Sequence, residues 1–475
     1  MGRKQQHSAD PTTEPKKRRR VGFSDIVLGH WFCGADAGVE PNECIKIYLV
    51  SSKEEVGVLD SFCIVPVDLN SFFEEDGKIY GYQGLKITIW LSIVSFHAYA
   101  DITFQSTSDG GKGITDLTSS LQNIFAETLV KNKDEFLETF STENDNIRFA
   151  VSSGEVLQHK ASNGHVSHFN SHLEAAGSDL EVVRMVVDNI ATGSLYSRLV
   201  PLVLLLIDGS NPIDVTDPGW ELYVLIQKKK DQQSDIQHRL LGFTAVYRFF
   251  HYPDGARMRL SQILVLPPYQ RKGYGSYLVE VLSNVAIAEN VHDFTVEEPL
   301  DSFQHVRTCV DIQHLLAFEP IQDAVKSAVL QLKQGKLSKK IHAPRFVPPA
   351  SAVEDARKSL KINKKQFFQC WEILIYLGLD TVDKYMEDYM AIISNRVRAD
   401  ILGKDSGTEG KRVIDVLSTY DPETSFVMFR SHDGEPSSVQ IDGTQTNQEE
   451  QLQQLVDERI KQIKLIAQKV YPHDI

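Results

Sequence analysis

The chain has 475 residues, which at roughly 150 residues per domain suggests about three domains. Its hydrophobic fraction of 42% and charged fraction of 24% are ordinary for a folded soluble protein, and they exclude a wholly disordered chain and a collagen-like fibre. The net charge is −14, from 64 acidic and 50 basic residues. This charge excludes nucleic-acid binding by general attraction, whereas it permits attraction to a basic partner.

The apolar runs and the cysteines exclude further classes of protein. The longest apolar run, residues 199–207, has nine residues and contains Pro201, so it is too short to span a bilayer. The N-terminal segment is polar and basic without an apolar core, which argues against a secretory signal. The cysteines form no CxxC pair, which favours reduced cytosolic thiols and argues against structural zinc. They are Cys33, Cys44, Cys63, Cys309 and Cys370.

Residues 1–22 are predicted to be a disordered basic tail, because they are polar and contain few apolar side chains to bury. The run from Lys16 to Arg20 consists of five consecutive basic residues, which is typical of a nuclear import signal. A solvated basic tail is the alternative interpretation. With the import signal, we expect the protein in the nucleus and the cytoplasm.

Residues 23–180 are predicted to form a β-rich N-terminal domain. Segments rich in Val, Ile, Tyr and Trp, separated by Gly or Pro, indicate strands at 45–50 and 85–93. A charged turn is expected at 74–77 between two such segments. One or two helices are expected within 115–140, and a loop-rich stretch at 141–164.

Residues 181–345 are predicted to form a central domain in which several strands follow one another closely. Helical spacing covers 179–207, and a second helix is expected at 273–289. Strands are expected at 220–227, 240–251, 256–266 and 292–296.

Residues 346–475 are predicted to form a helical C-terminal domain after a proline-rich linker. Helices are expected at 352–389 and 449–470. The second helix has an apolar stripe that we interpret as facing a core rather than a coiled-coil partner. The stripe consists of Leu452, Leu455, Val456, Ile460, Ile463 and Ile466.

A short loop between a predicted strand and a predicted helix carries the chemistry. It reads Gln270-Arg271-Lys272-Gly273-Tyr274-Gly275. Two glycines at a helix start allow a ligand to approach the backbone closely, and the free N–H groups there favour an anion. The loop lacks the GxxxxGK[ST] and GxGxxG patterns, so it is neither a P-loop nor a dinucleotide-binding loop. We interpret it as a pyrophosphate-binding loop.

The pattern Gln-x-x-Gly-x-Gly between a strand and a helix resembles the acetyl-CoA loop of the GCN5-related N-acetyltransferase superfamily. The wider strings SQILVLPPYQRKGYG, DFTVEEP, GYQGLKI and IDVTDPGW resemble the catalytic subunits of type B histone acetyltransferases. This resemblance runs from about Gly22 to about Lys365. It implies an α+β fold, in which an N-acetyltransferase core with a mixed, mostly antiparallel sheet lies between a β-rich N-terminal domain and a helical C-terminal domain.

The resemblance also implies the catalytic groups. Lysine is almost wholly protonated at neutral pH, so acetyl transfer to its amine needs a base. By resemblance that base is Glu297, with Glu298 beside it and Asp208 as a further acidic position. Without the resemblance, the acidic pair would be a polar strand exit. Rival candidates are His292 and His305 as bases and Cys309 as a nucleophile, although nothing in the sequence pairs Cys309 with a base.

Acetyl-CoA is the implied cosubstrate, with no metal. The main chain of Ile263, Leu264 and Val265 is expected to bind the pantetheine as an added strand would, and Ser302 to make another contact. The alternative is that the three strand residues belong only to the core. The pyrophosphate is expected on Gln270, Arg271, Lys272, Gly273, Tyr274, Gly275 and Ser276.

The implied substrate is the basic N-terminal tail of newly synthesised histone four, with a WD-repeat β-propeller histone chaperone as partner subunit. Glu74, Glu75 and Asp76 on one side, and Tyr247, Arg248 and Phe249 on the other, are expected to touch the histone. The alternative for the acidic triplet is a solvated turn, and the alternative for Tyr247 and Phe249 is a buried face of the sheet. Two other functions stay open: a non-catalytic histone escort, and an N-acetyltransferase acting on other protein or small-amine substrates.

Overall fold

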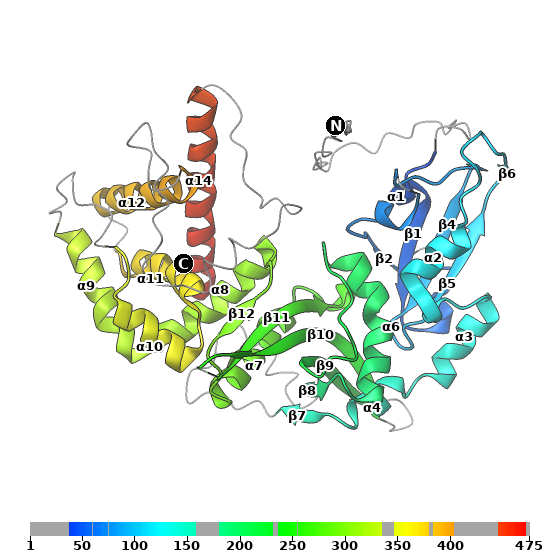
Figure 1. Ribbon diagram of the computed structural model, residues 1–475, viewed down its shortest axis with the longest axis horizontal. Helices are drawn as coiled ribbons and strands as arrows, with labels where there is room; N and C mark the ends of the chain where they lie inside the picture. Colours follow the sequence, from blue (N-terminus) through cyan, green and yellow to red (C-terminus); the bar gives the residue numbers. More distant parts are fainter. Residues whose placement is uncertain are drawn as a thin grey trace, which may run out of the picture.

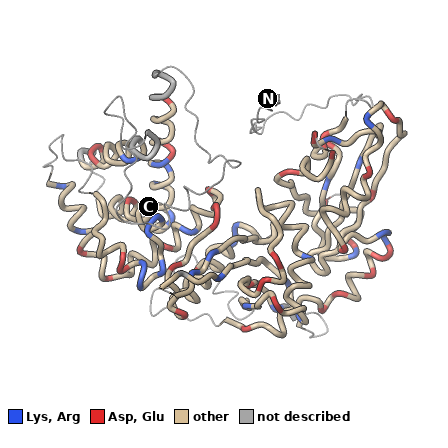
Figure 2. The backbone as a smooth tube through the Cα atoms, in the orientation of Figure 1, with Lys and Arg blue, Asp and Glu red and all other residues tan. Residues whose placement is uncertain are grey.

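The structure is a computed structural model with three parts that follow one another along the chain (Figure 1). Acidic and basic residues are spread over all three parts (Figure 2). The basic cluster at 16–20, Cys33 and Glu75 lie outside the residues that the structure describes. Those residues are 38–58, 60–74, 76–157, 180–230, 236–253, 255–334, 346–379, 383–402 and 445–471.

The N-terminal part is built on a four-stranded sheet in the order β2-β1-β4-β5, in which β1 and β4 run parallel. This confirms the strands expected at 45–50 and 85–93, and Gly77 N–H donates to the Glu74 carbonyl in the expected turn. The stretch 141–164 was expected to be loop-rich, but it contains a short helix and a strand. The strands are β1 Ile45–Val50, β2 Phe62–Ile64, β3 Tyr82–Gln83, β4 Lys86–Ser92, β5 Ala98–Thr103 and β6 Ser106–Thr107, and the helices are α1 Pro41–Cys44, α2 Leu117–Phe125, α3 Lys133–Thr142 and α4 Asn146–Val151.

The central part is a six-stranded sheet in the order β12-β11-β10-β9-β8-β7. Its described strands pair antiparallel except for β11 and β12, which pair in parallel, so the expected mixed sheet is confirmed. β7 precedes residue 180 in the chain and yet pairs with β8. The strands are β7 Glu155–Leu157, β8 Leu180–Val186, β9 Trp220–Lys230, β10 Ile236–His251, β11 Gly255–Val265 and β12 Phe294–Val296, and the helices are α6 Ile190–Leu206 and α7 Tyr274–Ala288.

The prediction of helical spacing over 179–207 was wrong for residues 180–186 and is confirmed by α6 in the later part of the stretch. Residues 180–186 form β8, which pairs along its length with β9. Val182 and Val183 are both buried, on opposite faces of the sheet, so a short run of apolar residues fits a covered strand as well as a helix. The helix starts only after Asn189, whose side chain accepts a hydrogen bond from the Ala191 N–H at 2.9 Å.

The two helices cover opposite faces of the central sheet. Leu222 and Val224 of β9 pack toward α6, whereas Tyr223 and Leu225 of the same strand pack toward α7. The strand is therefore apolar on both sides, as expected for a strand in the middle of a layered α/β structure. Through α6, the central sheet is joined to the N-terminal sheet in a single hydrophobic cluster.

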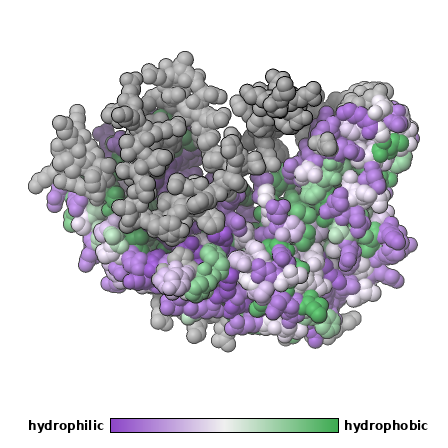
Figure 3. All heavy atoms as spheres, in the orientation of Figure 1, coloured by the Kyte–Doolittle hydropathy of each residue, from purple (hydrophilic) through white to green (hydrophobic). Residues whose placement is uncertain are grey.

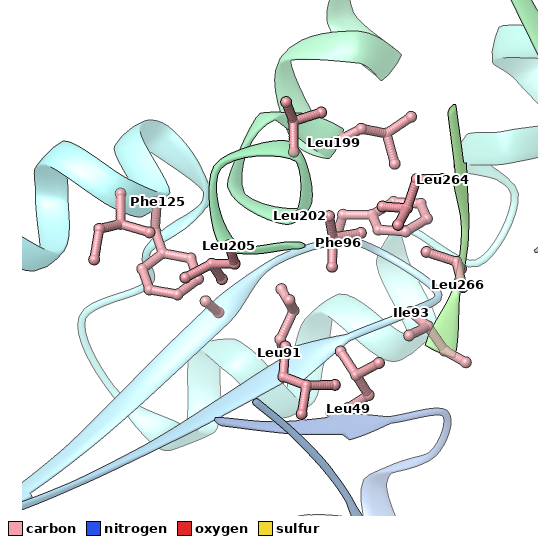
Figure 4. Close-up of a cluster of buried hydrophobic side chains, with 14 of the residues drawn as sticks. Leu49, Leu91, Ile93, Phe96, Phe125, Leu199, Leu202, Leu205, Leu264 and Leu266 are labelled. Atoms are coloured by element: carbon pink, nitrogen blue, oxygen red, sulfur yellow. The ribbon is translucent and has the colours of Figure 1, made fainter. Parts of the chain in front are cut away.

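That cluster contains leucines from elements far apart in the sequence (Figure 4). Leu49 of β1 and Leu91 of β4 face the α6 residues Leu199 and Leu202, and Leu264 of β11 closes the cluster from the other side. Each of these side chains is at most 5% exposed. Their burial ties the N-terminal sheet to the strand that carries the candidate site.

The C-terminal part is a group of helices that packs against the outer edge of β12. Phe294 N–H donates to the Lys361 carbonyl at 2.8 Å, and the Arg307 guanidinium donates to the Phe294 carbonyl at 3.0 Å. Helices α8 and α9 had no counterpart in the sequence prediction. The helices are α8 Asp301–Leu316, α9 Gln322–Lys333, α10 Ala350–Leu360, α11 Lys364–Gly378, α12 Asp383–Leu402 and α14 Gln445–Val470.

The apolar stripe of α14 faces the core of the helical part, as predicted. Val456, Ile460, Ile463 and Ile466 belong to one buried cluster with α8, α9, α10, α11 and α12. None of the helices in the described part of the chain is long and apolar enough to cross a membrane. Most of the described surface visible in Figure 3 is hydrophilic, with apolar patches near the junction of the N-terminal part and the central sheet.

The cluster around α6 generates a stability prediction. Leu202 is 0% exposed, whereas Ile190, at the start of the same helix, is 90% exposed. We expect Leu202→Ala to lower the free energy of unfolding by about 2–5 kcal/mol, because it leaves a cavity between two sheets. Ile190→Ala should change it by less than about 0.5 kcal/mol. Urea denaturation followed by circular dichroism measures both, and equal effects would contradict the role assigned to the cluster.

Candidate active site

The site is a cleft that opens where β11 and β12 separate. The two strands pair in parallel from Met258/Phe294 to Leu260/Val296, and the Glu297 N–H still donates to the Leu260 carbonyl at 2.9 Å. Beyond that bond β12 ends, and β11 continues to Val265 without pairing to it. The edge of β11 from Ser261 onward therefore has backbone that an extended ligand can reach.

A β-bulge at Ser261 sets the direction of this edge. In the pairing of β10 with β11, Leu260 and Gln262 are opposite successive residues of β10, so Ser261 is the extra residue. Gln262 is 3% exposed and accepts a hydrogen bond at 2.9 Å from the hydroxyl of Tyr196 on α6. Its amide nitrogen donates to the Asn211 carbonyl at 2.7 Å. The buried Gln262 thus holds the loop that follows α6 against β11.

The opposite end of β11 leads into the predicted pyrophosphate loop. A 3-10 turn at Pro267–Tyr269 precedes it, and α7 begins at Tyr274 with Gly273 as its N-cap. Gly273 has a φ of +87°, a conformation that glycine adopts readily, and it supplies no capping side chain. The first N–H groups of α7 have no partner within the helix, so they are available to an anion.

Gly275 indicates that this helix start is shaped for a ligand. A Cβ atom built on Gly275 would have the Cγ2 atom of Val265 as its nearest neighbour, at 4.0 Å. Protein packing therefore does not require glycine at this position. The space that a side chain would fill belongs to the cleft, which suits the close approach of a diphosphate to the helix backbone.

One cleft of about 1700 Å³ brings the predicted catalytic and cofactor residues together. Its two walls are β11 with the start of α7, and the end of β12 with the start of α8. The loop after α6 also lines it. The predicted residues in its lining are Asp208, Ile263, Leu264, Val265, Gln270, Arg271, Lys272, Gly273, Tyr274, Gly275, Ser276, Glu297, Glu298 and Ser302.

Three carboxylates line the cleft, and two of them directly follow β12. Glu297 follows β12 directly, and its carboxylate accepts a hydrogen bond from the hydroxyl of Ser261 across the opening. Glu298 is next to it with a φ of +37°, and Asp208 comes from the loop after α6. A side chain held by hydrogen bonding at the mouth of the separated strands is well placed to take a proton from a bound amine.

The rival catalytic candidates are placed differently. His292 is held by Arg357, which donates to its carbonyl at 3.0 Å, and it is not part of the cleft lining. His305 lines the cleft, but burial and the nearby Lys469 ammonium lower its pKa. Cys309 does have a base next to it, because His305 Nε2 lies 3.8 Å from its Sγ, contrary to the sequence reading. Burial raises the pKa of Cys309 to about 11, so it is a poor nucleophile.

The predicted substrate residues fall into two groups outside the cleft lining. Glu74 and Asp76 are exposed on the N-terminal part, where the Asp76 carboxylate accepts a hydrogen bond from the Tyr80 hydroxyl at 2.5 Å and pairs with Lys112. Glu75 lies outside the described residues. Asp76 is therefore partly engaged by its own chain.

The three predicted residues of β10 do not share a face. The Tyr247 ring packs on Trp220, a residue of the cleft lining, with 4.9 Å between ring centroids, and Phe249 lies beside Tyr247 at 6.3 Å. Arg248 points to the α7 side, where it pairs with Glu221 at 2.8 Å and with Glu289 at 2.5 Å. The alternation of a β-strand separates it from its neighbours. Contact of these three residues with the histone stays a prediction, and the ion pairs place Arg248 on a different face from Tyr247.

Several lining residues were missed by the sequence reading. In the sequence, Trp220 ends one of the strings that carry the resemblance and Ser261 stands within another, and neither position predicts that the residue borders the cleft. Lys469, near the end of α14, also lines the cleft, from a segment with no recognised role. Sequence spacing gives no signal for Lys469, because the contact depends on how the helical part folds back.

Known proteins resemble the chain over nearly its whole length. Residues 37–208 match the family described as histone acetyl transferase HAT1 N-terminus, and residues 217–302 match the acetyltransferase (GNAT) family. The histone acetyltransferase type B catalytic subunit of Arabidopsis thaliana is 61% identical over 472 residues, which cover 99% of this chain and 98% of the relative. The subunit of the same name from Zea mays is 46% identical over 475 residues, with 99% and 97% covered.

A solved aminoglycoside acetyltransferase from an uncultured soil sample aligns with 26% of this chain and 82% of its own length, at 14% identity and a TM-score of 0.21, which is too low for an inference. The family matches and the full-length relatives confirm the resemblance noted in the sequence and the α+β fold with its acetyltransferase core. The chain belongs to the family of type B histone acetyltransferase catalytic subunits.

Proposed function

We propose that this acetyltransferase moves the acetyl group of acetyl-CoA to the ε-amine of lysines in the N-terminal tail of newly synthesised histone four. The observation that carries the proposal is the shared cleft, in which the start of α7 and the Glu297 carboxylate lie on two walls that separate at Ser261. The basic tail suits the three carboxylates that line the cleft, which are Asp208, Glu297 and Glu298.

In this proposal the free edge of β11 and the start of α7 bind the cosubstrate. The main chain of Ile263 to Val265 pairs with the pantetheine, and the N–H groups at the start of α7, with Arg271 and Lys272, hold the diphosphate. The Val265 carbonyl already accepts a hydrogen bond from the Gln270 side chain at 2.9 Å, so Gln270 braces the strand end against the loop. Acetyl-CoA supplies the thioester that is attacked.

Glu297 acts as the general base in a direct attack. Its carboxylate takes a proton from the lysine ammonium, and the neutral amine then attacks the thioester carbonyl carbon. The C–N bond forms, the C–S bond breaks, and the departing thiolate of coenzyme A takes up the second proton that the attacking nitrogen loses. Ser261 keeps the Glu297 carboxylate at the opening through their hydrogen bond.

The substrate is tested by mass spectrometry of the full chain incubated with acetyl-CoA and free histones. We expect acetyl-lysine in the tail of histone four, and no acetylation of spermidine in a parallel reaction. Acetylation of spermidine alone would favour a small-amine enzyme, and no acetylation despite measurable acetyl-CoA binding would favour a histone escort. The β-propeller partner and the presence in nucleus and cytoplasm stay predictions of the sequence.

Replacing the base separates chemistry from binding. Glu297→Gln keeps a group that can accept the Ser261 hydrogen bond but cannot take a proton at neutral pH. We expect kcat to fall about 10²–10⁴-fold, as is usual for the loss of a general base, with the acetyl-CoA affinity unchanged. Steady-state rates and calorimetry measure the two quantities. If Glu298→Gln lowered kcat further than Glu297→Gln, the assignment would pass to Glu298.

The glycine at the helix start gives a test of the cosubstrate site. Gly275→Ala places a Cβ in open cleft space, so we expect the thermal midpoint to stay the same or rise, because alanine favours a helix. The acetyl-CoA affinity should fall at least about tenfold, since the added group occupies the position of the diphosphate. Gly193→Ala is the matched control, because Gly193 lies in α6 with its nearest neighbour at 3.8 Å and outside the cleft lining. Equal affinities for both variants would contradict the site.

A further inference from the structure

The cations that line the cleft come from two distant places in the chain. Among the described lysines and arginines, Arg271 and Lys272 border it at the start of α7, and Lys469 borders it from α14. All three side chains are exposed. The first two belong to the predicted diphosphate site, whereas nothing in that site explains Lys469.

Lys469 is held in place by the packing of its own helix. Ile466, Ala467 and Val470 are buried at 3%, 5% and 7% exposure, so the last turn of α14 is anchored in the helical core. Figure 1 shows α14 in red, running down to α8. Lys469 is close enough to His305 on α8 to lower the pKa of that imidazole, after the larger effect of burial. His305 is therefore neutral near pH 7, and Lys469 is the cation of this wall.

The position of Lys469 along the cleft follows from the order of the two walls. One wall runs from Ser261, beside Glu297, to the start of α7, and the five residues of β11 from Ser261 to Val265 span about 13 Å. The other wall runs from Glu297 into α8, and His305 lies one turn beyond the start of that helix at Asp301. On both walls, acidic residues thus lie at the reacting end and basic residues lie farther along. This order suits a ligand that has a neutral thioester at one end and phosphates at the other.

We propose that Lys469 pairs with the 3′-phosphate of the coenzyme A ribose, which makes the C-terminal helix part of the cosubstrate site and a determinant of cosubstrate specificity. This inference rests on the proposed use of acetyl-CoA. The diphosphate is matched by the helix start with Arg271 and Lys272, so the remaining phosphate, farthest from the thioester, needs a cation of its own. An ammonium paired with a phosphate makes a charge-assisted hydrogen bond, which is among the stronger polar interactions.

The test compares binding of coenzyme A and 3′-dephospho-coenzyme A to the full chain by calorimetry. We expect Lys469→Ala to weaken coenzyme A binding about tenfold and to leave dephospho-coenzyme A binding unchanged, so that the preference of the wild type for the phosphorylated form is lost. Lys469→Arg should keep most of the preference. Lys461→Ala, which removes an exposed lysine of the same helix outside the cleft lining, should behave as the wild type.

Two results with the Lys469→Ala variant would overturn the inference: an equal loss of affinity for both ligands, or no loss for either. Thermal midpoints equal to that of the wild type show that the variants are folded. If the wild type bound neither ligand, the proposed use of acetyl-CoA itself would fail. If the wild type bound both equally and tightly, only the assignment of Lys469 would fail.

Discussion

The site depends on the place where β11 and β12 part. Up to Leu260 the two strands form an ordinary parallel pair, and the Glu297 N–H makes the last bond between them. The bulge at Ser261 then turns β11 away, while its hydroxyl still holds the Glu297 carboxylate. This separation leaves backbone of β11 accessible without exposing a long unpaired strand at the edge of the sheet, which would invite aggregation.

Neighbouring parts of the protein keep the strands apart. On one side, Tyr196 of α6 holds Gln262, and Gln262 holds the loop that carries Asp208 to the cleft. On the other, β12 has only three residues, and its Phe294 is bonded to Lys361 and Arg307 of the helical part. Such a short strand gains little stability from its own pairing, so the helical part contributes to the position of Glu297.

The sequence was most informative where a local pattern has a local cause. The loop from Gln270 to Gly275 was read correctly as a turn into a helix, because glycine at a helix start is a property of the backbone there. The pattern of apolar residues gave a wrong prediction at residues 180–186. There α6 and α7 bury both faces of the strand, so the sequence does not alternate between apolar and polar residues. It also gave no sign of the ion pairs of Arg248 with Glu221 and Glu289, because these require the sheet and the end of α7 to meet.

By itself, the sequence determined the order of the three parts, the motif at the start of α7 and the acidic pair that follows a short strand. Each of these features consists of residues that are close together in the chain. Only the tertiary structure decided which of these residues share a cleft, that Ser261 reaches Glu297, and that Lys469 returns from the last helix to the same cavity. The reason is physical: side chains far apart in the chain meet through the packing of buried faces, and periodicity identifies such a face without identifying what it packs against.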